Sequence, residues 1–260
     1  MAKPVYREIR RFLTARDIQI LNHLWKWKIL SSQAIARKFF PGIRPESAHL
    51  RLRQLEEVKF IESVQVEKRC YAWQLNKRGY NFIRMHMSED IHQGYRAEYP
   101  YHDFLTTAFH LGEWLDRDLD CEDIYTEQEL RCNPDEFYPE WIPQSILHRP
   151  DGYSRTTQGD KQTLFAFEVE LSLKSKKRYE NLVYFYENQP TIDHVLWVLG
   201  TKGMLGSIKR IFERYNASQF SKHNFVFLED FLKTGWQTQI KQGNLEGKTL
   251  QDLLDRKSVV

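Results

Sequence analysis

The first third of the chain shows apolar positions at helical spacing and then at strand spacing. Thr14 is a suitable N-cap, and Asp17 in the following turn complements the positive end of a helix. Apolar residues then recur on one face of each expected helix. The elements predicted in this third are helices from Thr14, over 33–40 and over 45–55, a hairpin with strands at 60–66 and 71–75, and a helix from 76.

Three helices followed by a two-stranded wing are the plan of a winged helix-turn-helix domain, which we assign to residues 1–87. In such a domain the third helix enters the major groove and the wing touches phosphate. The predicted DNA-binding residues are Ser47, His49, Arg51, Arg53 and Gln54 on the third helix, with Lys68 and Arg69 at the basic tip of the hairpin. The alternatives are a solvated helix face or a protein–protein module.

The rest of the chain predicts an α/β sandwich with a mixed sheet flanked by helices. We interpret 88–100 as a linker, 101–235 as the second domain and 236–260 as a peripheral tail. The predicted elements are a helix from 101, a strand at 123–125, a helical turn at 126–130, a loop at 133–143, strands at 145–151 and 163–172 joined by a turn over 152–162, a helix over 173–188, a buried strand over 194–199, a helix over 205–216 and a strand over 224–228.

Charge divides the chain in the same way. Residues 1–87 carry 18 Lys and Arg against 7 Asp and Glu, a balance of +11, whereas the remainder carries 20 against 28, a balance of −8. A basic third joined to an acidic remainder indicates a nucleic-acid-binding module attached to another domain. Three scattered cysteines without a C-x-x-C pair argue against disulfides and structural zinc. Because no apolar run suits a membrane span or a secretion signal, we expect a cytoplasmic protein with no membrane partner.

Candidate chemistry centres on three carboxylates in the second domain. Glu168 and Glu170 stand at i and i+2 of a predicted strand, so their side chains leave the same face. Asp151, after Pro150 on the neighbouring strand, could complete an all-oxygen site. Hard cations such as Mg²⁺ bind one or two carboxylates together with waters and substrate phosphates. The pattern therefore predicts phosphodiester chemistry with Mg²⁺ or Mn²⁺, and the alternative is an exposed pair on an edge strand.

Other catalytic signatures are absent from the sequence. The sequence contains no G-x-x-x-x-G-K-[ST] phosphate loop, which would indicate an ATPase. It also contains no G-x-S-x-G elbow, which would indicate a serine hydrolase. The sequence also lacks a histidine cluster, so it does not support a relaxase that uses a histidine-bound metal and a tyrosine nucleophile. The 13 tyrosines leave a covalent phosphotyrosine step open without selecting one of them.

Pro150-Asp151 and Glu168-Val169-Glu170 resemble the two motif elements of the PD-(D/E)xK nuclease superfamily. With the predicted winged helix, Thr126-Glu127-Gln128-Glu129-Leu130 and Arg149-Pro150-Asp151-Gly152, about residues 10–230 resemble the plasmid replication-relaxation family. That family includes the MobC-type mobilisation relaxases. The resemblance implies a restriction-endonuclease-like second domain that nicks DNA.

The resemblance also implies roles for single residues. Asp151 and Glu168 are the expected metal ligands, with Glu170 a third ligand or the base for water. Many members of the superfamily have a lysine where this chain has Glu170. Either Lys174 or Lys176 from the next helix replaces that lysine and offsets negative charge, or the site is degenerate and only binds DNA. Glu127 or Glu129 is a further candidate acid.

The residues predict metal-dependent phosphodiester chemistry, and the resemblance implies a bacterial DNA-nicking protein that starts plasmid mobilisation or conjugative transfer. Its expected partners are double-stranded DNA at an origin of transfer, together with relaxosome accessory and coupling proteins. The first alternative is a non-catalytic replication or transcription regulator with a degenerate nuclease-like domain. The second is a restriction-type endonuclease that cuts both strands as a homodimer.

Overall fold

The computed structural model describes residues 13–85, 94–115, 122–132, 138–144, 147–158, 160–216 and 222–254. The chain divides into two compact units, Met1–Thr107 and Ala108–Val260, and the division falls within helix α6 (Pro100–Leu115). Part of the predicted linker, 88–93, and part of the predicted loop, 133–137, lie outside the described residues.

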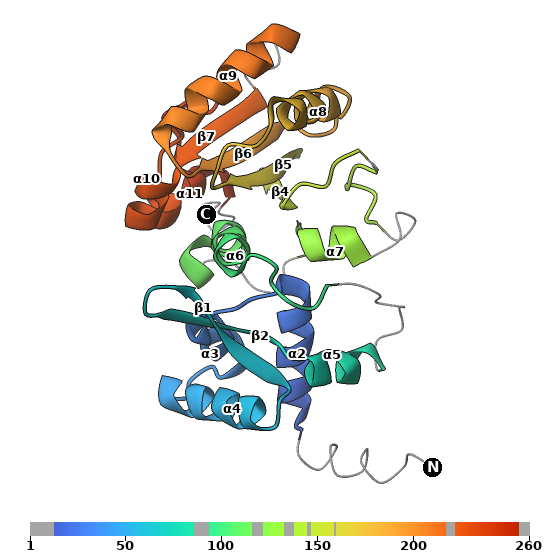
Figure 1. The fold of residues 1–260 in the computed structure, drawn as a ribbon, viewed down its shortest axis with the longest axis vertical. Helices are drawn as coiled ribbons and strands as arrows, with labels where there is room; N and C mark the ends of the chain where they lie inside the picture. The colour runs from blue at the N-terminus through green and yellow to red at the C-terminus, as the bar shows by residue number, and fades with distance from the viewer. Residues whose placement is uncertain are drawn as a thin grey trace. The chain divides into compact units, whose positions relative to one another are not determined.

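The first unit consists of helices followed by a β-hairpin and a further helix (Figure 1). Its elements are α2 (Ala15–Trp27), α3 (Ser32–Phe39), α4 (Pro45–Glu57), β1 (Ile61–Glu67), β2 (Cys70–Leu75) and α5 (Lys77–Arg84). The predicted start of the first helix is confirmed, because Thr14 and Asp17 form a reciprocal capping box. Asn76 likewise caps α5 through its side chain.

The core of the first unit joins the helices to the hairpin. Leu24, Leu52, Leu55 and Leu75 are completely buried, and burying a side chain of this size contributes about 1.5–3 kcal/mol. Strands β1 and β2 pair in antiparallel register, and their turn carries the predicted basic tip. A backbone bridge from Leu30 to β2 extends this small sheet by one residue pair.

The second unit is built on a five-stranded mixed sheet in the order β3-β4-β5-β6-β7. Strands β3, β4 and β5 are antiparallel, whereas β6 and β7 continue the sheet parallel to β5. Its strands are β3 (Ile124–Thr126), β4 (Gly152–Gln158), β5 (Lys161–Glu170), β6 (His194–Leu199) and β7 (His223–Phe227), and its helices after α6 are α7 (Glu127–Cys132), α8 (Lys176–Glu187), α9 (Lys202–Asn216), α10 (Leu228–Thr234), the 3-10 helix η3 (Gly235–Gln237) and α11 (Leu250–Leu254). The predicted mixed α/β class is confirmed.

One predicted strand and turn are wrong. The sequence predicts a strand over 145–151 and a turn over 152–162, but β4 occupies 152–158 and pairs with β5 through to Lys161. Residues 145 and 146 lie outside the described part of the chain, and 147–151 are not a strand. The polar composition of 152–162 resembles a turn, yet these residues complete backbone hydrogen bonds with β5. Asp151 therefore precedes a strand instead of ending one.

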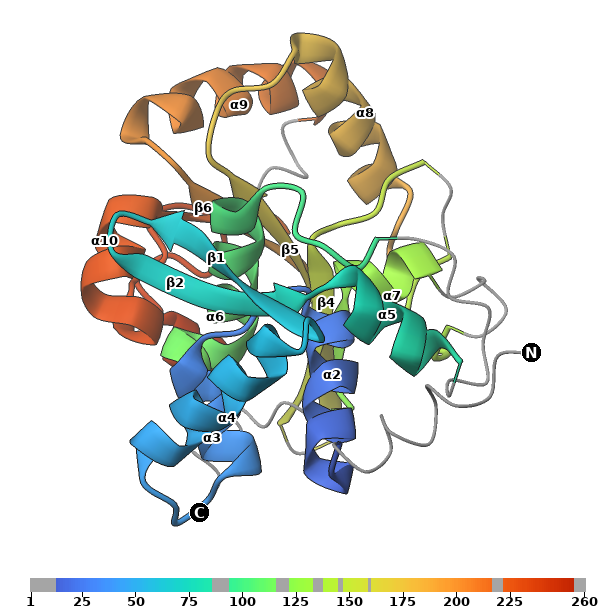
Figure 2. The same ribbon diagram turned by 60° about the horizontal axis from the view of Figure 1, so that its bottom comes forward.

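Helices α8 and α9 lie together on one face of this sheet (Figures 1 and 2). Their apolar side chains pack with the even-numbered residues of β5, such as Leu164 and Ala166, and with Trp197 of β6 in one buried cluster. Phe167, which is odd-numbered, contacts Phe109 of α6. Because side chains alternate along a strand, Glu168 and Glu170 lie on the face that α8 covers.

The segment after Gly235 is not peripheral. Trp236, Ile240, Leu250 and Leu254 are each no more than 2% exposed, and the Trp236 indole donates to the Phe109 carbonyl at 3.0 Å. The prediction of a peripheral tail is therefore wrong for residues up to 254, and 255–260 lie outside the described residues. Among the helices that the structure describes, none is long and apolar enough to cross a membrane.

Candidate functional site

The β4–β5 hairpin brings the three predicted carboxylates to one end of the sheet. Gly152 pairs with Phe167, and the Asp151 amide donates to the Phe167 carbonyl at 3.0 Å. The Asp151 carboxylate accepts the Val169 amide at 2.7 Å, so Asp151 lies beside the backbone that links Glu168 to Glu170. The predicted proximity of the three acids is thus present, although through a different strand assignment.

Glu168 and Glu170 are interior residues. Strand β5 is the middle strand of the five, and the two side chains are 3% and 2% exposed. The alternative of an exposed pair on an edge strand is therefore wrong. Two carboxylates on one buried face without bulk water raise the free energy of each other's charged form.

Glu168 is held by two donors that the sequence did not reveal. The Tyr186 hydroxyl of α8 donates to Oε1 of Glu168 at 2.5 Å, and Nε2 of His148 lies 2.5 Å from the same oxygen. His148 is in the segment that leads to Asp151. A histidine three positions before Asp151 was the only sequence signal for this contact, whereas Tyr186 looked like an ordinary apolar residue of its helix.

Glu170 differs from Glu168 in having no such support. Its Oε2 is buried and has no hydrogen-bond partner among the described residues. Burial raises the pKa of Glu170 to about 7, the nearby Glu168 and Asp151 add to the effect, and Lys174 and Arg178 act in the opposite direction. Near neutral pH this carboxyl is therefore divided between its protonated and ionised forms.

Cationic side chains lie beside Glu170 at the start of α8. Nε of Arg178 is 3.9 Å from Oε1 of Glu170, and Lys174 is close enough to lower the pKa of Glu170. Lys176 pairs instead with Glu180 at 3.3 Å. Of the two lysines predicted to replace the missing motif lysine, Lys174 therefore acts on the acid cluster, and Arg178 joins it.

The described residues do not contain a ready-made metal cage. Among them, no group of three or more His, Cys, Asp or Glu side chains is arranged so that it could hold a metal ion. Mg²⁺ nevertheless needs only one or two carboxylates, since waters and phosphate oxygens supply the rest. The unpartnered Oε2 of Glu170 is the kind of oxygen donor that such a cation prefers. Oxygen donors of the type that a hard divalent cation binds are therefore present, although the described side chains do not form a complete coordination shell.

The two further candidate acids have local structural roles. Glu129 accepts hydrogen bonds from the backbone and hydroxyl of Thr126, at 2.8 and 2.9 Å, and so caps α7. Glu127 pairs with Arg131 at 3.1 Å along the same helix.

In the first unit, the predicted DNA-binding side chains fall into two groups. Ser47 and His49 on α4 and Lys68 and Arg69 at the hairpin turn are exposed. Arg53, also exposed, pairs with Glu56 at 2.6 Å.

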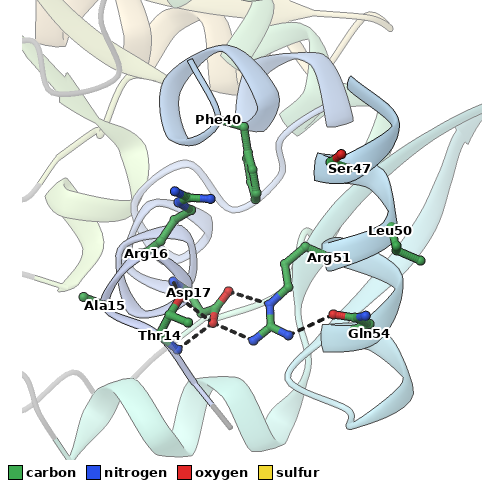
Figure 3. Close-up of a pocket in the computed structure, with 9 residues that line it drawn as sticks. All are labelled: Thr14, Ala15, Arg16, Asp17, Phe40, Ser47, Leu50, Arg51 and Gln54. Carbon is green, nitrogen blue, oxygen red and sulfur yellow. Dashed lines mark hydrogen bonds and ion pairs between the residues drawn. The ribbon is translucent and has the colours of Figure 1, made fainter. Parts of the chain in front are cut away.

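Arg51 and Gln54 belong to a second group, which faces α2 (Figure 3). Nε and Nη2 of Arg51 donate to the two oxygens of Asp17 at 3.0 and 2.7 Å, and Nη1 donates to Gln54 at 2.9 Å. Burial alone would raise the pKa of Asp17, but hydrogen bonds from Arg51 and Thr14 lower it below its ordinary value. The pair anchors α4 to α2, and sequence reasoning missed it because 34 residues separate its members.

This ion pair borders a pocket of 590 Å³ between the start of α2 and α4. Phe40 and Leu50 contribute apolar surface, and the Arg16 guanidinium lies over the Phe40 ring at 4.7 Å. In Figure 3, Leu50 points away from the ion pair.

Comparisons of the chain with protein-family models, with curated proteins and with solved structures found no match.

Proposed function

We propose that this protein is a metal-dependent DNA-nicking enzyme whose first unit binds duplex DNA and whose second unit cleaves one strand. The resemblance to the plasmid replication-relaxation family supplies the biological setting, which is the start of plasmid mobilisation or conjugative transfer at an origin of transfer. In that setting the protein acts in the bacterial cytoplasm with relaxosome accessory and coupling proteins.

The observation that carries the proposal is the buried carboxyl of Glu170, which lies beside Glu168 and Asp151. Its Oε2 has no hydrogen-bond partner among the described residues. A cluster of this kind opposes folding unless a cation or a proton neutralises it. Structural ion pairing does not remove the problem, because Arg178 is 3.9 Å away and half exposed. The arrangement is typical of a site that binds a cation for a purpose other than stability.

Asp151, Glu168 and Glu170 are the residues that would hold Mg²⁺ or Mn²⁺. When bound, such an ion polarises a phosphate oxygen and lowers the pKa of a coordinated water. The chain itself contributes positive charge at the same place, since Lys174, just before the N-cap of α8, and Arg178, in the first turn of α8, are both exposed. Their side chains can neutralise negative charge that develops on a scissile phosphate.

The order of elements in the second unit supports a restriction-endonuclease-like fold. Helix α6 precedes the antiparallel strands β3, β4 and β5, and α8 then connects β5 to the parallel strand β6. The acids lie just before β4 and at the end of β5, so the hairpin formed by these two strands carries all three of them.

The first unit supports the DNA-binding half of the proposal. Its three helices and hairpin have the order of a winged helix, and residues 1–87 carry a net charge of +11. Ser47 and His49 are available for base edges, and Lys68 and Arg69 for phosphates. Arg51 holds the recognition helix in place through Asp17.

The test is relaxation of a supercoiled plasmid that carries the cognate origin of transfer. Nicking is expected with Mg²⁺ or Mn²⁺, and it should disappear in EDTA and in Asp151→Ala and Glu168→Ala while DNA binding persists. Glu213→Ala, an exposed change on α9, is the matched control and should nick normally. Binding without nicking, or nicking that ignores both site variants, would refute the enzymatic proposal.

A specific observation favours one alternative, the non-catalytic DNA-binding regulator. Glu168 already receives two hydrogen bonds on Oε1, and no metal-holding trio exists among the residues that the structure describes. This regulator would bind the same DNA but would leave the plasmid supercoiled under every metal condition. The restriction-type alternative gives a third product, because a homodimer that cuts both strands yields linear DNA instead of open circles.

A further inference from the structure

Two donors converge on one oxygen of Glu168, and both belong to residues outside the motif. Tyr186 is completely buried, and His148 is 15% exposed. Each lies 2.5 Å from Oε1. Two hydrogen bonds to one oxygen fix the plane of a carboxylate, because rotation about its terminal bond would break both.

The two donors are themselves held by packing. The His148 ring makes edge contacts with Phe185 and Tyr186, at centroid distances of 5.2 and 6.0 Å. Tyr186 also contacts His223, and its carbonyl accepts a hydrogen bond from Lys222 at 3.1 Å. The segment before Asp151 and helix α8 therefore contribute one donor each.

We infer that His148 and Tyr186 are positioning residues that fix the Glu168 carboxylate through Oε1 and leave its other oxygen for a divalent cation. This inference rests on the proposed metal-dependent function. Outer hydrogen-bond partners of metal ligands typically change metal affinity 10–100-fold when they are removed. The contrast with Glu170 supports the inference, since its Oε2 has no partner among the described residues.

The same geometry assigns Tyr186 a role as a donor and not as a nucleophile. Its side chain is completely buried, so its hydroxyl cannot reach a DNA phosphate. A covalent phosphotyrosine step through this residue is therefore excluded.

The test measures Mn²⁺ binding to the full chain by electron paramagnetic resonance, which does not depend on catalysis. Tyr186→Phe and His148→Phe each remove one donor and retain an aromatic ring. Both are expected to weaken Mn²⁺ binding about 10–100-fold. His148→Gln, which restores an N–H donor, should recover part of the affinity. Tyr153→Phe is the matched control, since Tyr153 is buried nearby and its hydroxyl does not bond Glu168.

The outcomes separate this inference from the proposed function. Wild-type chain that binds Mn²⁺ no better than Asp151→Ala would overturn both. Wild-type binding that Asp151→Ala abolishes but that Tyr186→Phe and His148→Phe leave unchanged would overturn the positioning role alone. Near-ultraviolet circular dichroism of each variant checks that the fold is intact. Equal weakening in His148→Phe and His148→Gln would also count against the inference, because it would show that the N–H donor is not what matters.

Discussion

Replacing Glu170 by glutamine should stabilise the metal-free protein at alkaline pH and leave it nearly unchanged at acidic pH. Burial, assisted by Glu168 and Asp151, raises the pKa of Glu170 from 4.5 to about 7. The folded state therefore keeps a proton that the unfolded chain has already released. The contribution of this group to the free energy of unfolding is fully present below pH 4.5 and is lost as the pH rises through about 7. The glutamine side chain does not ionise, so the free energy of unfolding of this variant does not show the decline.

The magnitude follows from the two pKa values. Each pKa unit corresponds to about 1.4 kcal/mol, so the full difference is roughly 3 kcal/mol above the folded-state pKa. This figure is an upper bound, because relaxation of the site and water entry reduce the cost of the charge. Saturating Mn²⁺ should offset the same loss in the wild type, since a ligand at 100 times its Kd stabilises by about 2.7 kcal/mol.

The assay is urea denaturation of the full chain in EDTA at about pH 5 and about pH 9, where the two protonation states dominate. Pulsed hydrogen exchange with mass spectrometry on peptides from β5 and β6 reports the second unit separately from the first. Glu213→Gln on α9 is the matched control, because that side chain is 46% exposed, and it should show no pH-dependent gain. An equal gain at both pH values, or no gain at about pH 9, would refute the claim that burial penalises the Glu170 carboxylate.

Three further outcomes are expected from other parts of the chain. Lys68→Ala and Arg69→Ala should weaken DNA binding and each reduce the slope of log K against log salt by about 0.9, measured by fluorescence anisotropy across a salt series. An unchanged slope would mean that the hairpin tip does not touch phosphate. Asp17→Ala should cost about 2–4 kcal/mol by loss of the Arg51 pair and of the Asp17 half of the capping box, read as faster hydrogen exchange in α2 and α4. Trp236→Phe should cost about 0.5–1.5 kcal/mol by loss of one buried hydrogen bond, and a neutral result in denaturation would show that this bond does not stabilise the fold.

The parts of the fold that depend on local chemistry could be predicted from the sequence. The start of the first helix follows from the Thr14–Asp17 capping box, whose partners are three residues apart. Strand β6 matches its predicted range of 194–199 because its apolar run is continuous and buried. In both cases the deciding interactions lie within one short segment.

Features that depend on distant segments could not be predicted. Strand β4 consists of polar residues whose hydrogen-bond partners lie on β5, so composition alone suggests a turn. The Asp17–Arg51 pair joins residues 34 positions apart. It engages the Arg51 guanidinium, which the sequence predicts to contact DNA bases. The burial of residues after Gly235 likewise requires the Phe109 carbonyl and the core around it.

In the candidate site, two residues of one strand show both a feature that local sequence predicts and a feature that depends on distant segments. Their spacing predicts that Glu168 and Glu170 share a face, and this local inference holds because side chains alternate. Their different roles depend on what lies opposite each of them. Glu168 meets donors from α8 and from the segment before Asp151, whereas Oε2 of Glu170 meets none among the described residues. The spacing of two residues on a strand therefore predicts a shared face, but it does not predict which of the two carboxylates receives hydrogen bonds.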